Sequence, residues 1–237
     1  MWLMTTKGRP QAARKAIQQC WDTGMRQPAV MYVDGDPAGY DFTLPDNWTR
    51  YEGNGNLAGS KRYLFETYPH ERIYGWLADD NWPETPDWSY IVEDRAYPWY
   101  LIHCQDKWMS EHRTQWYALR ETTNLGAGTC WGGELVRAVG WWSPPNITQA
   151  SIDWAWTSLV GKTPLGVYLH NVIVRHDNWR TGRRAQDSND TSIIAETMTP
   201  FVRKDIDTIR NWIGSDDFQQ TRERVLHGYQ KYITGTG

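Results

Sequence analysis

The sequence predicts an α/β fold: one domain with a Rossmann-like, mixed but mostly parallel sheet flanked by helices, and a helical extension at the C-terminus. Three observations lead to this fold class. The chain opens with a strand, a helix and a strand; strand and helix patterns then alternate as far as residue 106; and the tail from about residue 188 carries helical patterns. A strand–helix–strand unit implies parallel strands joined by a right-handed crossover. We therefore expect residues 1–187 to form the sheet-containing domain and residues 188–237 to pack on it.

The opening unit spans residues 2–36. The apolar run "WLMTT" (2–6) is the first strand, and Pro10 suits the first turn of the helix that follows. Five apolar side chains recur at helical spacing on one face of this helix: Ala13, Ala16, Ile17, Cys20 and Trp21. Gly24 is placed to end the helix, and "AVMYVDGD" (29–36) forms the second strand.

The remaining elements follow from the same patterns. We expect strands at 47–53, 72–82, 98–106 and 166–179, and helices at 57–69 and 83–96, the second of these capped by Asp87. A short helix lies between Gly133 and Gly140, another lies within 143–161, and two more occupy the tail. Residues 107–128, rich in Trp, Thr and Gly, are expected to be an insertion that caps the sheet.

Composition narrows the possible functions. A net charge of −3 argues against a protein whose whole surface binds nucleic acid. Three widely spaced cysteines indicate reduced thiols, and no apolar run approaches the ~20 residues of a membrane span, so we expect a cytoplasmic protein without a membrane partner. The 16 Trp and 13 Tyr residues suit both a core and a site that stacks on sugars or bases.

Polar residues lie at the ends of four of the predicted strands. In chain order they are Thr5, Thr6, Lys7 and Arg9, then Asp34 and Asp36, then Asp79 and Asp80, and last His176. Ligands of open α/β sheets bind at the carboxyl ends of the strands, so these side chains can converge on one crevice. Carboxylates together with phosphate oxygens hold Mg²⁺ or Mn²⁺, and Mn²⁺ also accepts an imidazole. The pattern favours a site for a nucleotide diphosphate and a divalent cation, although turns for the aspartates and a backbone hydrogen bond for His176 remain open.

Three stretches in order, "MTTKGRP", "VMYVDGD" and "GWLADDNW", resemble the glycosyltransferase A-type (GT-A) fold of nucleotide-sugar transferases. The resemblance implies that Thr5, Thr6 and Arg9 hold the nucleotide and that Asp34 contacts the base or ribose. The family's DxD-type motif stands here as "ADDN", which departs from the strict pattern. It implies that Asp79 is the ribose-side residue and Asp80 the ligand of Mn²⁺ or Mg²⁺.

The resemblance continues along the chain. "NLAGSKR" implies that Asn56 and Lys61 lie near the donor diphosphate and sugar, and "VIVRH" implies that His176 completes the metal site. "SIDWAW" implies that Asp153 is the general base, although a solvated acid at the start of a helix is the plain alternative. The candidate acceptor contacts are two aromatic and three basic residues: Trp141, Trp142, Arg180, Arg183 and Arg184.

These features predict a metal-dependent glycosyltransferase that moves a sugar from a nucleotide-diphosphate sugar, uridine-linked by expectation, to an acceptor hydroxyl. The chain is similar to small soluble transferases of bacteriophages, so the acceptor is either a hydroxymethylated pyrimidine in DNA, such as 5-hydroxymethylcytosine, or a saccharide. Two alternatives are a nucleotidyltransferase that acts on a sugar phosphate and a non-catalytic carbohydrate-binding module. "TTKGRP" has too little glycine for the former, and the latter leaves Asp79, Asp80 and His176 without a role.

Overall fold

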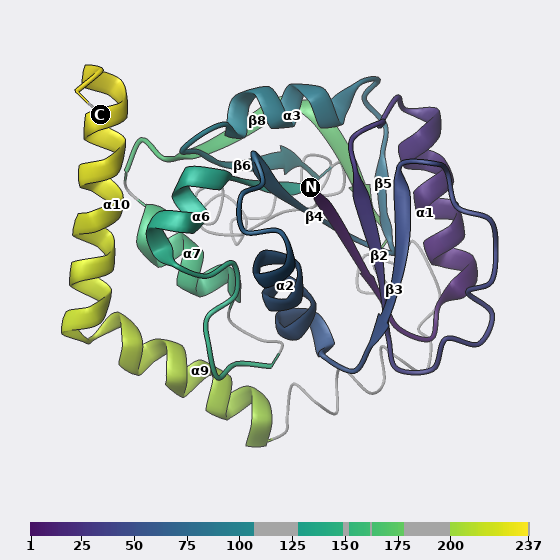
Figure 1. The fold of residues 1–237 in the computed structure, drawn as a ribbon, viewed down its shortest axis with the longest axis horizontal. Helices are drawn as coiled ribbons and strands as arrows, with labels where there is room; N and C mark the ends of the chain where they lie inside the picture. Colours follow the sequence, from purple (N-terminus) through teal and green to yellow (C-terminus); the bar gives the residue numbers. More distant parts are fainter. Residues whose placement is uncertain (107–127, 149–151, 162, 178–199, 237) are drawn as a thin grey trace, which may run out of the picture.

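A computed structural model describes residues 1–106, 128–148, 152–161, 163–177 and 200–236 (Figure 1). Within these residues eight strands lie in the order β3-β2-β1-β4-β7-β6-β8-β5. Their bounds are β1 Trp2–Thr6, β2 Ala29–Asp34, β3 Trp48–Gly53, β4 Ile73–Ala78, β5 Asn81–Pro83, β6 Leu101–Gln105, β7 Thr129–Gly132 and β8 Gly166–His176. Strands β3, β2, β1 and β4 run parallel, as do β6 and β8, whereas β7 is antiparallel to both of its neighbours. The predicted mixed, mostly parallel sheet is confirmed.

Helices cover both faces of this sheet because successive side chains of a strand point to opposite faces. Trp2 and Met4 of β1 share one core with α1 (Pro10–Asp22) and α3 (Trp88–Ala96). Leu3, between them, belongs to a second core with α2 (Asn56–Thr67), α6 (Gly133–Val139) and α7 (Ile152–Val160). The helices α9 (Pro200–Ile213) and α10 (Asp216–Thr234) pack outside α7 and α6 on this second side (Figure 1).

Three local expectations need correction. The strand expected at 72–82 is two strands, because the chain turns at Asp79 and Asp80 and β5 then pairs antiparallel with β8. Strand β7 was not predicted, since it ends on the first glycine of a glycine pair and gives too short an apolar run. Asp87 occupies the N-cap position of α3, but its backbone is left-handed (φ 53°) and its side chain makes no capping hydrogen bond.

The expected short helix before Gly140 is present. The short helix after Gly133 ends at Gly140, whose φ of 90° is the left-handed conformation that ends helices. The insertion predicted at 107–128 lies almost wholly outside the described residues. None of the helices described here has the length and apolar character that crossing a bilayer requires.

Candidate active site

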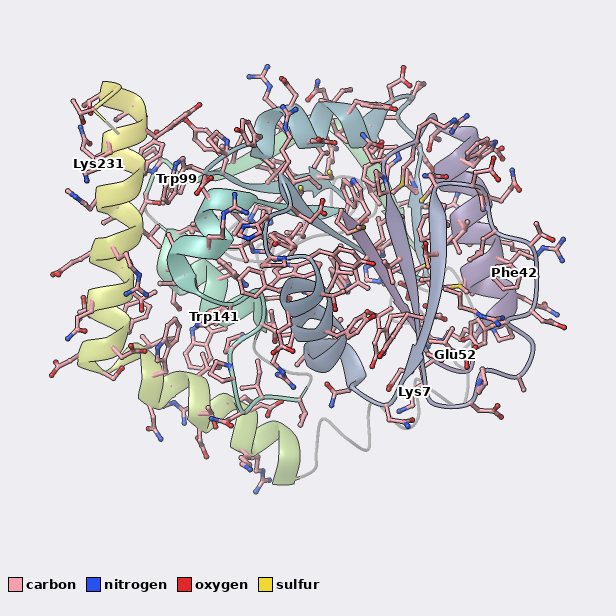
Figure 2. The ribbon with its side chains drawn as sticks, viewed as in Figure 1. Lys7, Phe42, Glu52, Trp99, Trp141 and Lys231 are labelled. Carbon is pink, nitrogen blue, oxygen red and sulfur yellow. The ribbon has the colours of Figure 1, made fainter. Side chains whose placement is uncertain are left out.

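The carboxyl ends of three neighbouring parallel strands bring the predicted nucleotide-binding residues together. The register places Thr6 of β1 beside Val33 of β2, so Asp34 follows next to Lys7. The Lys7 ammonium lies 3.3 Å from Asp34 Oδ2, and Asp34 Oδ1 accepts a hydrogen bond from the backbone N–H of Asn56 at 3.1 Å. Figure 2 shows Lys7 and Glu52 at the same edge of the sheet. Asp34 therefore ties the ends of β1 and β2 to the start of α2.

Asp79, directly after β4, is held by residues that follow β1. Thr6 Oγ1 donates to Asp79 Oδ2 at 2.8 Å, and Arg9 Nη1 lies 3.3 Å from Asp79 Oδ1. Since the Thr6 proton is used in this way, the Tyr40 hydroxyl 2.9 Å away donates to Thr6 while accepting from the Arg9 backbone N–H at 2.8 Å. Tyr40 is fully buried and was not predicted. The result is one continuous hydrogen-bond chain from the turn after β1 to Asp79.

Burial and the neighbouring Asp80 charge raise the pKa of Asp79 to about 6, although Arg9 and Thr6 act in the opposite direction. Asp79 is 4% exposed, so little water stabilises the charge of its carboxylate. Such a group favours ligands that donate hydrogen bonds, and a ribose hydroxyl is one of them.

Asp80 faces His176 across the turn between β4 and β5. The distance from Asp80 Oδ1 to His176 Nε2 is 3.3 Å, and the Asp177 N–H donates to the Asp80 carbonyl at 2.9 Å. On the other side of the ring, His176 Nδ1 lies 3.8 Å from Asp106 Oδ2. Asp106 follows β6 and is 5% exposed; it was missed, although it ends a predicted strand just as Asp34 does.

This donor set fits Mn²⁺ or Mg²⁺ that is also bound by phosphate. Nowhere in the described ranges do three His, Cys, Asp or Glu side chains come together as a complete metal-binding group. Asp80 and the Nε2 of His176 supply two ligands, and such ions commonly take the rest from diphosphate oxygens and water. A carboxylate behind a ligating imidazole, as Asp106 lies here, fixes the ring orientation and the tautomer.

A cavity of about 510 Å³ opens beside the two aspartates. Its walls include Arg9, Asp79, Asp80, Trp82 and Asp177, together with the first turn of α1. That turn begins at Pro10, has no side-chain cap and holds no acidic residue, so its N–H groups carry the partial positive charge of a helix N-terminus. The guanidinium of Arg9 adds a full positive charge beside them. The cavity therefore combines groups that attract an anion with the carboxylates that would bind its counter-cation.

Two of the predicted donor contacts serve the fold itself. Asn56 Oδ1 accepts from the N–H groups of Ala58 and Gly59 and so begins helix α2. Thr5 Oγ1 shares a 2.9 Å hydrogen bond with Ser60 of α2. Both bonds fix α2 against the strand ends, so any donor contact by Thr5 or Asn56 comes in addition to this role.

The predicted base and the predicted donor lysine interact electrostatically. Asp153 lies in the first turn of α7 and is exposed by surface area, yet the protein around it is dense enough for desolvation to raise its pKa, which Lys61 in turn lowers. Lys61 is 1% exposed, and burial lowers its pKa to about 8, with Asp153 opposing that change.

The residues predicted to contact the acceptor differ in how far they are buried. Trp141 is half-buried and packs against Trp156 of α7 and Trp212 of α9 (Figure 2). Trp142 is 0% exposed, so the prediction that its ring stacks on an acceptor does not fit; the ring packs in the core against Tyr74 and Trp131. The predicted basic contacts Arg180, Arg183 and Arg184 lie outside the described residues.

Comparison with solved structures decides the fold. The chain is similar to a mannosyltransferase from Pyrobaculum calidifontis, solved in complex with GDP-mannose and Mn²⁺, at a TM-score of 0.55 and 15% identity. The chain has a GT-A-like fold. The alignment covers 96% of this chain and 73% of the mannosyltransferase. A mycobacterial protein of known structure matches at a TM-score of 0.53 and 11% identity, over 90% of this chain and 74% of its own. No protein-family model and no curated protein sequence matches the chain.

Proposed function

We propose that this GT-A-like chain is a metal-dependent glycosyltransferase that moves a sugar from a nucleotide-diphosphate sugar, uridine-linked by our expectation, to an acceptor hydroxyl. One observation carries the proposal: Asp80 Oδ1 and His176 Nε2 face each other at 3.3 Å beside an anion-attracting cavity at the carboxyl ends of the strands. A structural turn would need neither a paired histidine nor Asp106 behind it.

In this proposal the nucleoside binds at the ends of β1 and β2. Asp34 and Thr6 contact the base or ribose, and Asp79 accepts from a ribose hydroxyl. Arg9 and the first turn of α1 attract the diphosphate. Asp80 and His176 hold Mn²⁺ or Mg²⁺, which would stabilise the negative charge of the departing nucleotide diphosphate.

Asp153 is the proposed general base. It accepts the proton of the acceptor hydroxyl as the oxygen attacks the anomeric carbon, and the bond to the diphosphate breaks in the same displacement. One displacement inverts the anomeric configuration. The exposure of Asp153 supports this role, because an acceptor must reach the base from solvent.

The acceptor is the finer part of the proposal: either a saccharide or a hydroxymethylated pyrimidine of phage DNA. The basic stretch at 174–184 carries the DNA alternative, since basic residues can hold the phosphates of a strand whose base is flipped out. Binding through such contacts weakens steeply as salt rises. Activity on hydroxymethylated DNA that does not change with salt would count against DNA contacts in this stretch.

The first experiment is a thermal-shift screen of UDP, GDP, dTDP and CMP with Mn²⁺, because a ligand of the folded state raises its apparent stability. The second measures release of nucleotide from the corresponding sugar donors. Asp80→Ala is expected to lower this release by about 10²-fold or more, since it removes a ligand of the ion that stabilises the leaving group. Asp94→Ala, on the exposed face of α3, is the matched control and should leave it unchanged.

Three other results would contradict the proposal. Formation of a nucleotide sugar from a nucleoside triphosphate and a sugar phosphate, with release of pyrophosphate, would make the chain a nucleotidyltransferase. Sugar binding without turnover of any donor would make it a binding module. Equal nucleotide release by the wild type and Asp80→Ala would show that Asp80 is not the metal ligand.

A further inference from the structure

Lys61 occupies an unusual environment for a lysine. It lies on α2, is 1% exposed, and its ammonium faces the rings of Trp76, Trp131 and Trp142 at 4.5, 4.8 and 5.6 Å from their centroids. Within the described part of the chain, the Lys61 ammonium has no hydrogen bond and no close ion pair. A buried ammonium is costly unless some group stabilises its charge, so this position needs an explanation.

The surrounding tryptophans provide only part of that stabilisation. Ring faces attract a cation, and the attraction is strongest when the contact is desolvated. The indole N–H groups of the three tryptophans are hydrogen-bond donors, and the Lys61 ammonium cannot accept a hydrogen bond from them. Each of these N–H groups is buried without an acceptor of its own. The charged group that acts on Lys61 is Asp153 of α7. The Lys61 ammonium and the Asp153 carboxylate therefore stabilise each other's charge without a direct ion pair.

The same tryptophans fix the two groups relative to each other. Trp142, part of the cage around Lys61, accepts a 2.9 Å hydrogen bond at its carbonyl from the Trp156 indole of α7. Trp131, also part of the cage, packs on Trp156 with ring centroids 5.8 Å apart. Trp156 is one turn after Asp153 on the same helix. The aromatic cluster thus holds the ammonium and the carboxylate-bearing helix in one rigid unit.

Among the described residues, Lys61 is the charged group that acts on Asp153. Asp153 is the one charged residue of α7 itself. On α9, which packs against α7, Asp205 accepts from Thr148, and Arg203, Lys204, Asp207 and Arg210 are exposed. The charged residues of α10 are exposed apart from the half-buried Arg222.

We propose that Lys61 is a positioning residue of the transfer reaction: its caged ammonium keeps Asp153 in the ionised form that accepts the proton of the acceptor hydroxyl. This inference rests on the proposed function of the site. Desolvation raises the pKa of Asp153 and so favours the protonated acid, which cannot act as a base. Lys61 lowers that pKa again. The role is electrostatic and requires no contact between Lys61 and either substrate.

Lys61→Met tests the proposal, because it removes the charge and keeps an unbranched side chain in the cage. We expect the acid limb of the kcat/KM profile to move to higher pH. At pH values below this limb, kcat/KM of the variant should be lower than that of the wild type by about tenfold for each pH unit of the displacement, and at pH values above it the two should be equal. Lys231→Met, on the outer face of α10 (Figure 2), removes the same charge far from α7 and should leave the profile unchanged. A uniform loss at every pH would overturn the proposal.

A second measurement needs no substrate and leaves Lys61 and its cage unaltered. Asp153→Asn leaves the tryptophans untouched, and the pKa of Lys61, followed by NMR of ¹³C-labelled lysine side chains, should fall below its wild-type value of about 8. An unchanged Lys61 pKa would refute the coupling even if Lys61→Met does not fold. If the wild type releases no nucleotide from any sugar donor, the proposed function fails instead, and the NMR result separates the two cases.

Discussion

Asp106 gives the sharpest test of the metal site, because it lies behind the imidazole of the proposed metal ligand His176. Its Oδ2 lies 3.8 Å from His176 Nδ1, on the side of the ring away from Asp80. The carboxylate favours the tautomer that carries its proton on Nδ1 and leaves Nε2 free to bind a cation. Asp106→Asn keeps the shape and removes the charge. Carboxylates placed behind ligating histidines contribute about 10–100-fold in metal affinity, or about 1.4–2.7 kcal/mol.

Titration calorimetry of Mn²⁺ in the presence of saturating nucleotide diphosphate measures this directly. We expect Asp106→Asn to raise the Kd for Mn²⁺ by about 10–100-fold, while the nucleotide affinity without metal stays close to the wild-type value. Asp94→Asn makes the same chemical change on the exposed face of α3 and serves as the control. A Kd within twofold of wild type would refute the argument that Asp106 orients His176. A parallel loss of metal-free nucleotide binding would indicate that the substitution had disturbed the fold.

Three further substitutions test other parts of the structure. Asp153→Asn should lower kcat by about 10²–10⁴-fold and leave the thermal shift with nucleotide and Mn²⁺ intact; near-normal turnover would exclude this base. Thr6→Val removes a buried hydroxyl with two hydrogen bonds, and urea titration should show a loss of about 1–3 kcal/mol. Gly75→Ala would place a Cβ against the Trp2 indole and should destabilise the protein by about 1–3 kcal/mol, whereas Gly166→Ala meets only ordinary contact and should be nearly neutral.

The strand-end residues of the candidate site could be predicted from the sequence for a simple geometric reason. Parallel strands end at the same edge of a sheet, so an acidic residue after an apolar run marks its own position. Asp34 and Asp79 both follow this rule, and the structure places them on either side of the end of β1. His176 ends β8 and meets Asp80 because β5 pairs with that strand.

Tyr40 and Asp106 could not be assigned in the same way, because their roles depend on contacts between distant segments. Tyr40 lies in the loop after β2, and its hydroxyl reaches Thr6 and Arg9, which are more than thirty positions earlier. Asp106 is an acidic residue at the end of a predicted strand, which is the pattern that identified Asp34. Its relation to His176, however, arises from the parallel pairing of β6 with β8, across an insertion whose length hides that pairing in the sequence.

The tryptophans show why composition alone is a weak guide to a sugar site. Their number suggested stacking surfaces, yet Trp131, Trp142 and Trp156 are fully buried and pack on one another. The faces of Trp131 and Trp142, together with Trp76, surround the Lys61 ammonium, and the Trp142 carbonyl accepts a hydrogen bond from Trp156 of the helix that carries Asp153. An aromatic core of this kind can hold a buried charge in a fixed position without touching a ligand. Under the proposed function, these tryptophans act through Lys61 and Asp153, and the acceptor surface has to be sought among other residues.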